Sequence, residues 1–416
     1  MAESSGDTGG KNILPAVFLS TFFIRLGFGL TLSIYAFYLG STVETVGLTA
    51  AASPLIEAST VLFAGLAADR FGRLPVLKWA LVAGAAILLL MSTTRNPVYL
   101  AVLSGIFGLA SASILAASLA ATGDMSLTSR RGMSMGQFDA LNLGGWVYGY
   151  ALGYGLVSVL NGQNDPSRLA MAFWIGGATV LVALALLWWM SRGYVEQGEA
   201  KVFDSKRLKE ALLRAEILLV VLPWLAIYML IGAMFTFLGS AATTLNVPLW
   251  ELGIGVAVGG TVLLFTQPFY GKLSDRFGRT RVMMIGVAGF LGVLAFGGAI
   301  AIKGLNLGLI AGLGISAFGA LAFGPSSLAA LTDESKKVSR GTTMSLYSMT
   351  IAGGMAFGLI LSSVLFTNMG TNGVVIFFGI VGALLVVFTA IRTFHLKGRA
   401  AAVASPVNSE SSSGRK

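Results

Sequence analysis

Long apolar segments alternate with short polar ones along almost the whole chain. Each apolar segment reaches about 20 residues, the length that a helix needs to cross a bilayer. Six lie before residue 191 and six after residue 215: 13–39, 46–68, 75–94, 97–121, 133–160 and 169–190, then 216–240, 251–270, 282–302, 306–331, 342–366 and 372–394. The pattern predicts an all-α polytopic membrane protein with 12 transmembrane helices in a pseudo-symmetric 6+6 arrangement.

Polar stretches divide the chain into five parts. We expect a disordered N-terminal leader (1–11), a first six-helix bundle (12–190), a cytoplasmic linker (191–215), a second six-helix bundle (216–395) and a disordered basic tail (396–416). The first apolar segment is too long for a signal-peptide core and no small-residue cleavage site follows it, so we expect it to be retained as a helix. Residues 205–214 fit a short amphipathic helix or a plain solvated linker equally well.

Composition supports burial in lipid. The chain has 416 residues, of which 55% are hydrophobic and 11% charged, with a mean hydropathy of +0.81, whereas soluble domains contain about a quarter charged residues. The net charge of +10 comes mainly from loops on one side of the predicted bundle. The loops on the other side contain only three lysines and arginines, namely Arg95, Arg168 and Lys303. Basic loops stay cytoplasmic. The sequence therefore predicts a multi-pass plasma-membrane protein with both termini in the cytoplasm, and no nucleic-acid partner is needed to explain its charge.

Several kinds of chemistry are excluded by what the sequence lacks. There is no cysteine, so disulfides and thiolate chemistry are impossible. The one histidine, His395, lies in the basic stretch after the last apolar segment. No phosphate-binding loop of the P-loop type and no set of nucleophile and base residues at the membrane face is present. We therefore expect no metal, no cofactor and no enzymatic activity.

Two short motifs occur once in each half. Gly65-Leu-Ala-Ala-Asp-Arg-Phe-Gly-Arg73 recurs as Gly271-Lys-Leu-Ser-Asp-Arg-Phe-Gly-Arg279, with six of nine positions identical. Each copy follows the second apolar segment of its half. A second pair lies between the fourth and fifth segments, where Asp124 stands seven residues before Arg131 and Asp333 seven before Arg340. Such duplication places two six-helix bundles side by side around an axis along the membrane normal, with a cavity between them.

At these residues the sequence resembles the major facilitator superfamily, whose loop signature of glycine, three residues, aspartate, arginine, any residue, glycine and arginine is present twice. The resemblance implies a gating role in which Asp69 docks on the positively polarised start of the eleventh helix, near Gly341, and releases it on inward opening. The alternative is that these loops only fix topology, which the family suggests more strongly for Asp275. Gly72 and Gly278 would permit the turns, and Arg70, Arg73, Arg276 and Arg279 would pair with carboxylates or lipid phosphates.

The fifth segment carries Gly145, Gly149 and Gly153 at four-residue spacing. Small residues in this pattern let helices approach closely in lipid, so we expect a packing role. The segment also resembles the antiporter signature of the drug-efflux branch of that superfamily. It departs from the signature at Tyr150, where proline is expected, and at Tyr154, where glycine is expected, and these departures weaken the antiporter assignment.

Ionisable residues within the apolar segments usually mark function. At 1.5 Å per residue, Arg25 lies about 16 Å and Glu57 about 18 Å from the inner ends of their helices, near the bilayer midplane. Asp139 lies about 10 Å into the fifth helix, with Asn142 on the same face. One hypothesis is that Glu57 or Asp139 binds the coupled proton while Arg25 tunes its affinity. The alternative is a static salt bridge that fixes helices one, two and five.

The leading functional interpretation is a secondary active transporter of a small solute, proton-coupled and monomeric, with efflux of amphiphilic compounds as one possible direction. A proton-coupled uptake symporter for a small metabolite and a non-transporting membrane sensor or scaffold are the alternatives. The second half offers only neutral candidates for the cavity: Thr236, Gln267, Ser316, Tyr347 and Ser348.

Overall fold

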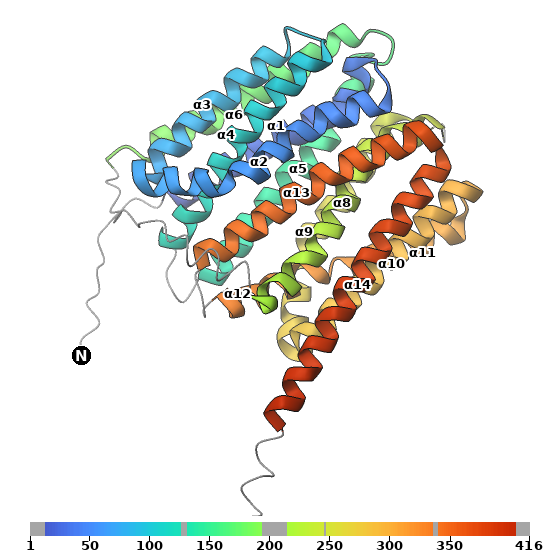
Figure 1. Ribbon diagram of the computed structural model, residues 1–416. Coiled ribbons are helices and arrows are strands. Elements are labelled where there is room, and N and C mark those ends of the chain that lie inside the picture. Colours follow the sequence, from blue (N-terminus) through green and yellow to red (C-terminus); the bar gives the residue numbers. More distant parts are fainter. Residues whose placement is uncertain (1–12, 126–130, 194–213, 245–246, 336–339, 405–416) are drawn as a thin grey trace, which may run out of the picture.

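A computed structural model describes residues 13–125, 131–193, 214–244, 247–335 and 340–404, and the described residues fold almost entirely into helices. The first half contains α1 (Leu14–Leu39), α2 (Val43–Phe71), α3 (Arg73–Met91), α4 (Pro97–Met125), α5 (Arg131–Val159), a 3₁₀ turn (Pro166–Leu169) and α6 (Ala170–Met190). The second half contains α8 (Ala215–Thr244), α9 (Leu249–Phe277), α10 (Arg279–Lys303), α11 (Leu307–Ala320), α12 (Phe323–Ser335), α13 (Arg340–Met369) and α14 (Thr371–Ala404). Figure 1 shows the two halves side by side.

Helix lengths and surfaces fit a bilayer. Among the described residues, eleven helical segments are long and apolar enough to span a membrane. Large apolar side chains point outward, including Phe63, Trp79 and Phe265, which are 68%, 74% and 80% exposed. A helix that is apolar on all sides is stable only when lipid or protein covers it. The chain is therefore an integral, multi-pass membrane protein. The remaining long helix, α5, is rich in glycine and carries Gln137, Asp139 and Asn142.

One predicted helix is interrupted. The apolar segment 306–331 was expected to form a single helix, but it is divided into α11 and α12 at Leu321–Ala322. Pro325 has no N–H with which to continue the helical ladder. The chain tightens before it, so that the amide of Ala322 donates to the carbonyl of Gly319. The hydroxyl of Tyr270 in α9 donates to the carbonyl of Phe318 at 2.9 Å. This carbonyl therefore has a hydrogen-bond partner from another helix next to the interruption.

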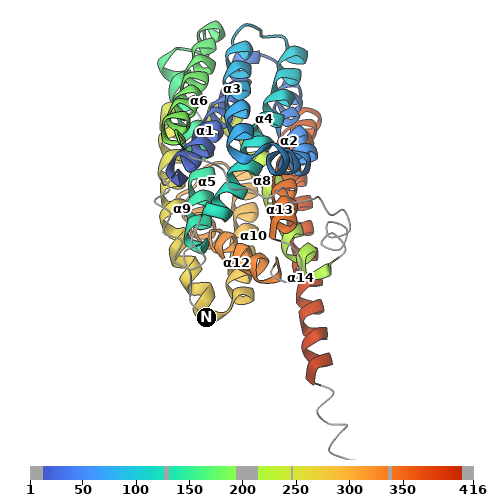
Figure 2. The same ribbon diagram turned by 90° about the vertical axis from the view of Figure 1, so that its left-hand side faces the viewer.

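The last helix is longer than predicted. The disordered tail was expected from residue 396, whereas α14 continues to Ala404 and projects beyond the bundle (Figures 1 and 2). Alanine favours helix, and Ala400, Ala401, Ala402 and Ala404 extend this one past the apolar segment. The predicted leader, most of the linker with its candidate amphipathic helix, and the end of the tail lie outside the described residues.

The two halves use the same helix packing. Glycines of α5 lie against carbonyls of α1, and glycines of α13 lie against carbonyls of α8 in the same register. A Cβ added to any of these glycines would come within 2.6 Å of a carbonyl oxygen, so only glycine allows these approaches. The four contacts are Gly145 on Phe22, Gly149 on Leu26, Gly354 on Leu225 and Gly358 on Met229.

Contacts between the halves are also paired, with α2 on α13 and α5 on α9. Gly47, near the start of α2, meets Ser363 of α13, and Gly253, at the matching position of α9, meets the carbonyl of Ala151 in α5. We call the end of the bundle with these contacts the distal end, and the end that carries the α2–α3 and α9–α10 loops the basic end. Nearer the basic end, Gly65 and Gly271 have open space beside them.

Candidate functional site

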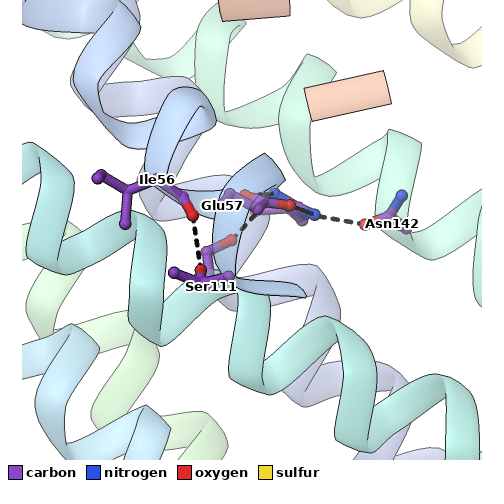
Figure 3. Close-up of polar contacts among 6 residues, drawn as sticks. Ile56, Glu57, Ser111 and Asn142 are labelled. Carbon is purple, nitrogen blue, oxygen red and sulfur yellow. Dashed lines mark hydrogen bonds and ion pairs between the residues drawn. The ribbon is translucent and has the colours of Figure 1, made fainter. Parts of the chain in front are cut away.

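A charged network lies within the first half, where four helices meet. Arg25 of α1 forms a two-pronged ion pair with Glu57 of α2, with Nη2 to Oε1 at 2.7 Å and Nη1 to Oε2 at 3.0 Å. Its Nη1 also donates to the hydroxyl of Ser111 in α4 at 3.0 Å, and its Nε donates to Oδ1 of Asn142 in α5 at 2.9 Å. Figure 3 shows Glu57, Ser111 and Asn142 converging on one point.

The network is withdrawn from solvent and lipid. Arg25 is 2% exposed and Glu57 is 3% exposed. The guanidinium also lies over the ring of Trp146 in α5, with Cζ 5.3 Å from the centroid. A two-pronged, fully desolvated pair of this kind is held both by charge and by geometry. Removing either partner alone would leave an uncompensated charge in a low-dielectric site.

Close approach of α5 to α1 positions this site. A Cβ on Gly145 would lie 2.3 Å from the carbonyl oxygen of Phe22 and 2.8 Å from Cβ of Arg25. The glycine therefore lets the backbones approach until Asn142, one turn earlier on α5, reaches the guanidinium. Gly149 and Gly153 continue the same line of contact, against Leu26 and Ser33. The residues expected to pack helices thus lie at the contact that builds the charged network.

The second half has no such network at the matching positions. Alignment through the repeated loops and glycine contacts pairs each member of the network with an apolar or uncharged residue. These counterparts are Tyr228 for Arg25, Leu263 for Glu57, Ala320 for Ser111 and Ile351 for Asn142. The same helix packing therefore forms in the second half without a buried ion pair. Because the charges are not needed for that packing, they call for another explanation.

Around Tyr228 the second half has an aromatic cluster instead. The ring of Trp224 lies 5.1 Å from that of Phe323, 5.4 Å from that of Tyr347 and 5.6 Å from that of Tyr228, measured between centroids. Gln267 approaches the same region, since its amide lies 3.5–3.6 Å from a Cβ built on Gly324. Two indole N–H groups, those of Trp146 and Trp224, are buried without a hydrogen-bond partner. Such unsatisfied donors are rare in proteins and need an explanation.

The repeated loops are alike in atomic detail. Gly72 and Gly278 end α2 and α9 with φ of 90° and 88°, a backbone conformation that favours glycine. Asp69 lies 3.8 Å from Arg73, and Asp275 lies 3.9 Å from Arg279. In each loop the arginine after the aspartate, Arg70 or Arg276, places its guanidinium 5.4 Å from the neighbouring phenylalanine ring. The Asp69 docking contact expected at Gly341 involves side chains outside the described ones.

Several predicted residues are placed by their helices only. Asp124 lies at the end of α4 and Arg131 begins α5, while Asp333 lies at the end of α12 and Arg340 begins α13. The motif therefore occupies the same place in both halves. Asp139 lies in α5. The side chains of all five are outside the described part of the structure, and so is that of Thr236.

Sequence reasoning missed three contributors. Ser111 carries no signal that separates it from the other serines of α4. Trp146 is not singled out by its position in the sequence, yet its ring lies under the guanidinium of Arg25. Tyr150, noted as a departure from a signature, donates to the carbonyl of Phe235 in α8 at 2.7 Å and so joins the two halves. Tyr148 makes a second link to Thr261 in α9 at 2.8 Å.

The described residues form two helical bundles with duplicated loops and a shared packing scheme, and a buried charged network in the first of them. This architecture is typical of membrane transporters of the two-domain type. A sequence profile described as Major Facilitator Superfamily matches residues 17–265 and 242–410. The chain belongs to this superfamily. No functionally curated protein matches it in sequence.

Several solved transporter structures share the fold of this chain. The nucleoside transporter NupG is 14% identical, with a TM-score of 0.64 over 91% of this chain and 98% of that chain. The POT family transporter PepTSo is 15% identical, with a TM-score of 0.69 over 93% and 99%. A POT family transporter in complex with 5-aminolevulinic acid is 12% identical, with a TM-score of 0.69 over 92% and 97%. At these identities the likeness establishes the fold and leaves the substrate open.

Proposed function

We propose that this protein is a proton-coupled secondary transporter of a small solute that works by alternating access, with Glu57 as the proton-binding group and Arg25 as its counter-charge. The observation that carries the proposal is the buried Arg25–Glu57 pair, which the second half lacks although its helices pack in the same way. Charges buried within membrane spans are costly and are retained where they serve transport.

The chemistry of coupling follows from the network. While Glu57 is ionised, it neutralises Arg25 and the pair can remain buried. Protonation of Glu57 removes its charge and leaves the guanidinium with only the neutral partners Ser111 and Asn142. The protonated site then favours either an anionic group of the substrate or contact with water. A proton and a conformational change are thereby linked through one charge. Asp139, on the same helix as Asn142, is the second candidate for the proton.

Alternating access requires the halves to separate at one end at a time. The described contacts between the halves lie in the middle and at the distal end, where Gly47 meets Ser363 and Tyr150 reaches α8. We assign the basic end to the cytoplasm from its arginines and lysines, which places both termini there. With this assignment, the contacts at the distal end hold the halves together on the outer side of the membrane.

The test uses purified protein in liposomes that contain a pH-sensitive dye. Candidate substrates are nucleosides and 5-aminolevulinic acid, taken from the structural relatives, together with amphiphilic cations. We expect at least one compound to move protons with it. If an inward proton gradient drives the compound into the liposomes, the protein is an uptake transporter. If the same gradient drives the compound out of them, it is an efflux transporter. Movement of a compound without protons, or of none in the panel, would contradict the proposal as stated.

The residue assignment is tested with Glu57→Gln and Asp139→Asn. Each substitution keeps the size of the side chain and removes its ability to bind and release a proton. We expect Glu57→Gln to abolish the dependence of transport on the proton gradient while the protein remains folded. Asp165→Asn is the matched control, since Asp165 is an acidic residue of an exposed loop. Wild-type coupling in both Glu57→Gln and Asp139→Asn would remove the assignment of the proton to either residue.

A further inference from the structure

A second arginine lies within a membrane-spanning helix, and no carboxylate of the described residues pairs with it. Arg392 is half-buried on α14, and its Nη1 contacts the thioether sulfur of Met283 in α10 at 2.7 Å. Among the described residues no aspartate or glutamate forms an ion pair with it. A thioether is a weak, neutral acceptor, whereas a guanidinium offers five donors in a planar fork. This charge is therefore far less satisfied than that of Arg25.

No acidic residue is among those that line the groove beside Arg392 in the described part of the structure. A narrow groove between α8, α10 and α14 is lined there by threonine, methionine and apolar side chains, including Thr280, Thr389 and Thr393. The hydroxyls of Thr389 and Thr393 already donate to carbonyls of their own helix. The groove has room for about one water molecule, so a larger ligand would bind at its mouth.

The depth of the site matches the phospholipid head-group layer. Met283 lies one turn inside the start of α10, about 6 Å from the basic end at 1.5 Å per residue. Beside it, Met284 is 43% exposed on α10 and Ile391 is 50% exposed on α14, and both offer apolar surface to acyl chains. Basic residues gather at this end in the second half: Lys272, Arg276, Arg279 and Arg281.

We propose that Arg392 binds the phosphate of an anionic phospholipid in the leaflet at the basic end of the bundle. The guanidinium fork fits two phosphate oxygens, and the surrounding basic residues favour a lipid with net negative charge. The lipid would bridge α10 and α14 at the edge of the second half. This site is separate from the transport network, which lies in the first half.

The experiment titrates phosphatidylglycerol or phosphatidylcholine into detergent-purified full-length protein and measures bound lipid by native mass spectrometry and the unfolding temperature by tryptophan fluorescence. We expect phosphatidylglycerol to bind the wild type and raise its unfolding temperature, and Arg392→Gln to weaken that binding by roughly tenfold. Arg281→Gln removes one exposed charge from the same end and should weaken binding far less than Arg392→Gln does, because Arg281 contributes only to the general attraction for anionic lipid.

Arg392→Lys keeps the charge but loses the planar fork, so we expect its lipid affinity to fall between that of the wild type and that of Arg392→Gln. This variant also serves if Arg392→Gln does not fold. Three results would overturn the proposal: equal losses in Arg392→Gln and Arg281→Gln, equal stabilisation by phosphatidylcholine, or equal stabilisation by inorganic phosphate alone. The last result would identify a site for free anions.

Discussion

Replacing the buried ion pair with the residues that the second half uses tests whether the pair serves function or folding. The variant is Arg25→Tyr combined with Glu57→Leu, which copies Tyr228 and Leu263. The second half packs in the same register with Tyr228 and Leu263 at these positions, so the double variant should fold if the pair is not needed for packing. Each single substitution, in contrast, leaves one charge buried without its partner.

The magnitudes follow from the geometry of the pair. Both side chains are almost fully buried, and removing one partner of a buried pair typically costs about 3–5 kcal/mol. With an unfolding-temperature change of about 2–4 °C per kcal/mol, each single variant should lose on the order of 10 °C. Replacing both partners with packed apolar groups is often neutral or stabilising, so the double variant should unfold within a few degrees of the wild type.

The two single variants should differ from each other. In Arg25→Tyr the remaining carboxyl can accept a proton and become neutral. In Glu57→Leu the guanidinium cannot lose its charge and keeps only Ser111 and Asn142 as hydrogen-bond partners. We therefore expect Glu57→Leu to be the less stable of the two.

The assay is thermal unfolding in detergent, followed by the fluorescence of the seven tryptophans, with transport in liposomes measured on the same preparations. We expect the double variant to be as stable as the wild type, and its transport to be independent of the proton gradient. A double variant as unstable as the single ones would show that the network is a structural tie. A stable double variant with wild-type coupling would refute the role of the pair in transport.

Two further predictions concern how the helices meet. Gly149→Ala should destabilise the protein by about 1–3 kcal/mol through overpacking, because its Cβ would lie 2.1 Å from a carbonyl oxygen of α1. Gly155→Ala, on the same helix with nothing within 4 Å, should unfold like the wild type, and equal effects would contradict the packing account. Tyr150→Phe should raise maleimide labelling of Ser363→Cys about two- to tenfold, because losing one hydrogen bond between the halves favours distal opening. Tyr154→Phe leaves that hydrogen bond intact, so Ser363→Cys should be labelled at its original rate in this background. Equal labelling rates in Tyr150→Phe and Tyr154→Phe would contradict the role of Tyr150 in keeping the distal end closed.

Much of the fold follows from the sequence because a bilayer limits the possible structures so strongly. A segment of about 20 apolar residues in lipid must be a helix, since its backbone groups have no other partners. The helices therefore begin close to the predicted positions, and the loop repeat reveals the duplication. The interruption at Leu321 was not predicted, because the effect of Pro325 depends on whether a neighbouring group such as Tyr270 completes the hydrogen bonding.

The site was predictable only in part. Arg25 and Glu57 stand out because charges are rare in apolar segments, and helical rise places them at similar depth. Nothing local indicates that Ser111 is a partner, because a serine in a membrane helix more often bonds to its own backbone. The role of Tyr150 was also hidden, because a phenol that replaces a signature proline has meaning only once its partner on α8 is known.

Duplication makes the second half a natural control for the first. Both halves descend from the same arrangement of loops and glycine contacts, so a residue that both require for packing should appear in both, as Gly149 and Gly358 do. Arg25, Glu57, Ser111 and Asn142 appear in one half only. The proton-coupled transport that we propose needs a charge that can change during the cycle and a surface that recognises the solute, and these demands need not fall on the same half. The charged network in the first half and the aromatic cluster around Trp224 in the second are consistent with such a division, in which the proton is handled on one side of the pathway and the body of the solute on the other.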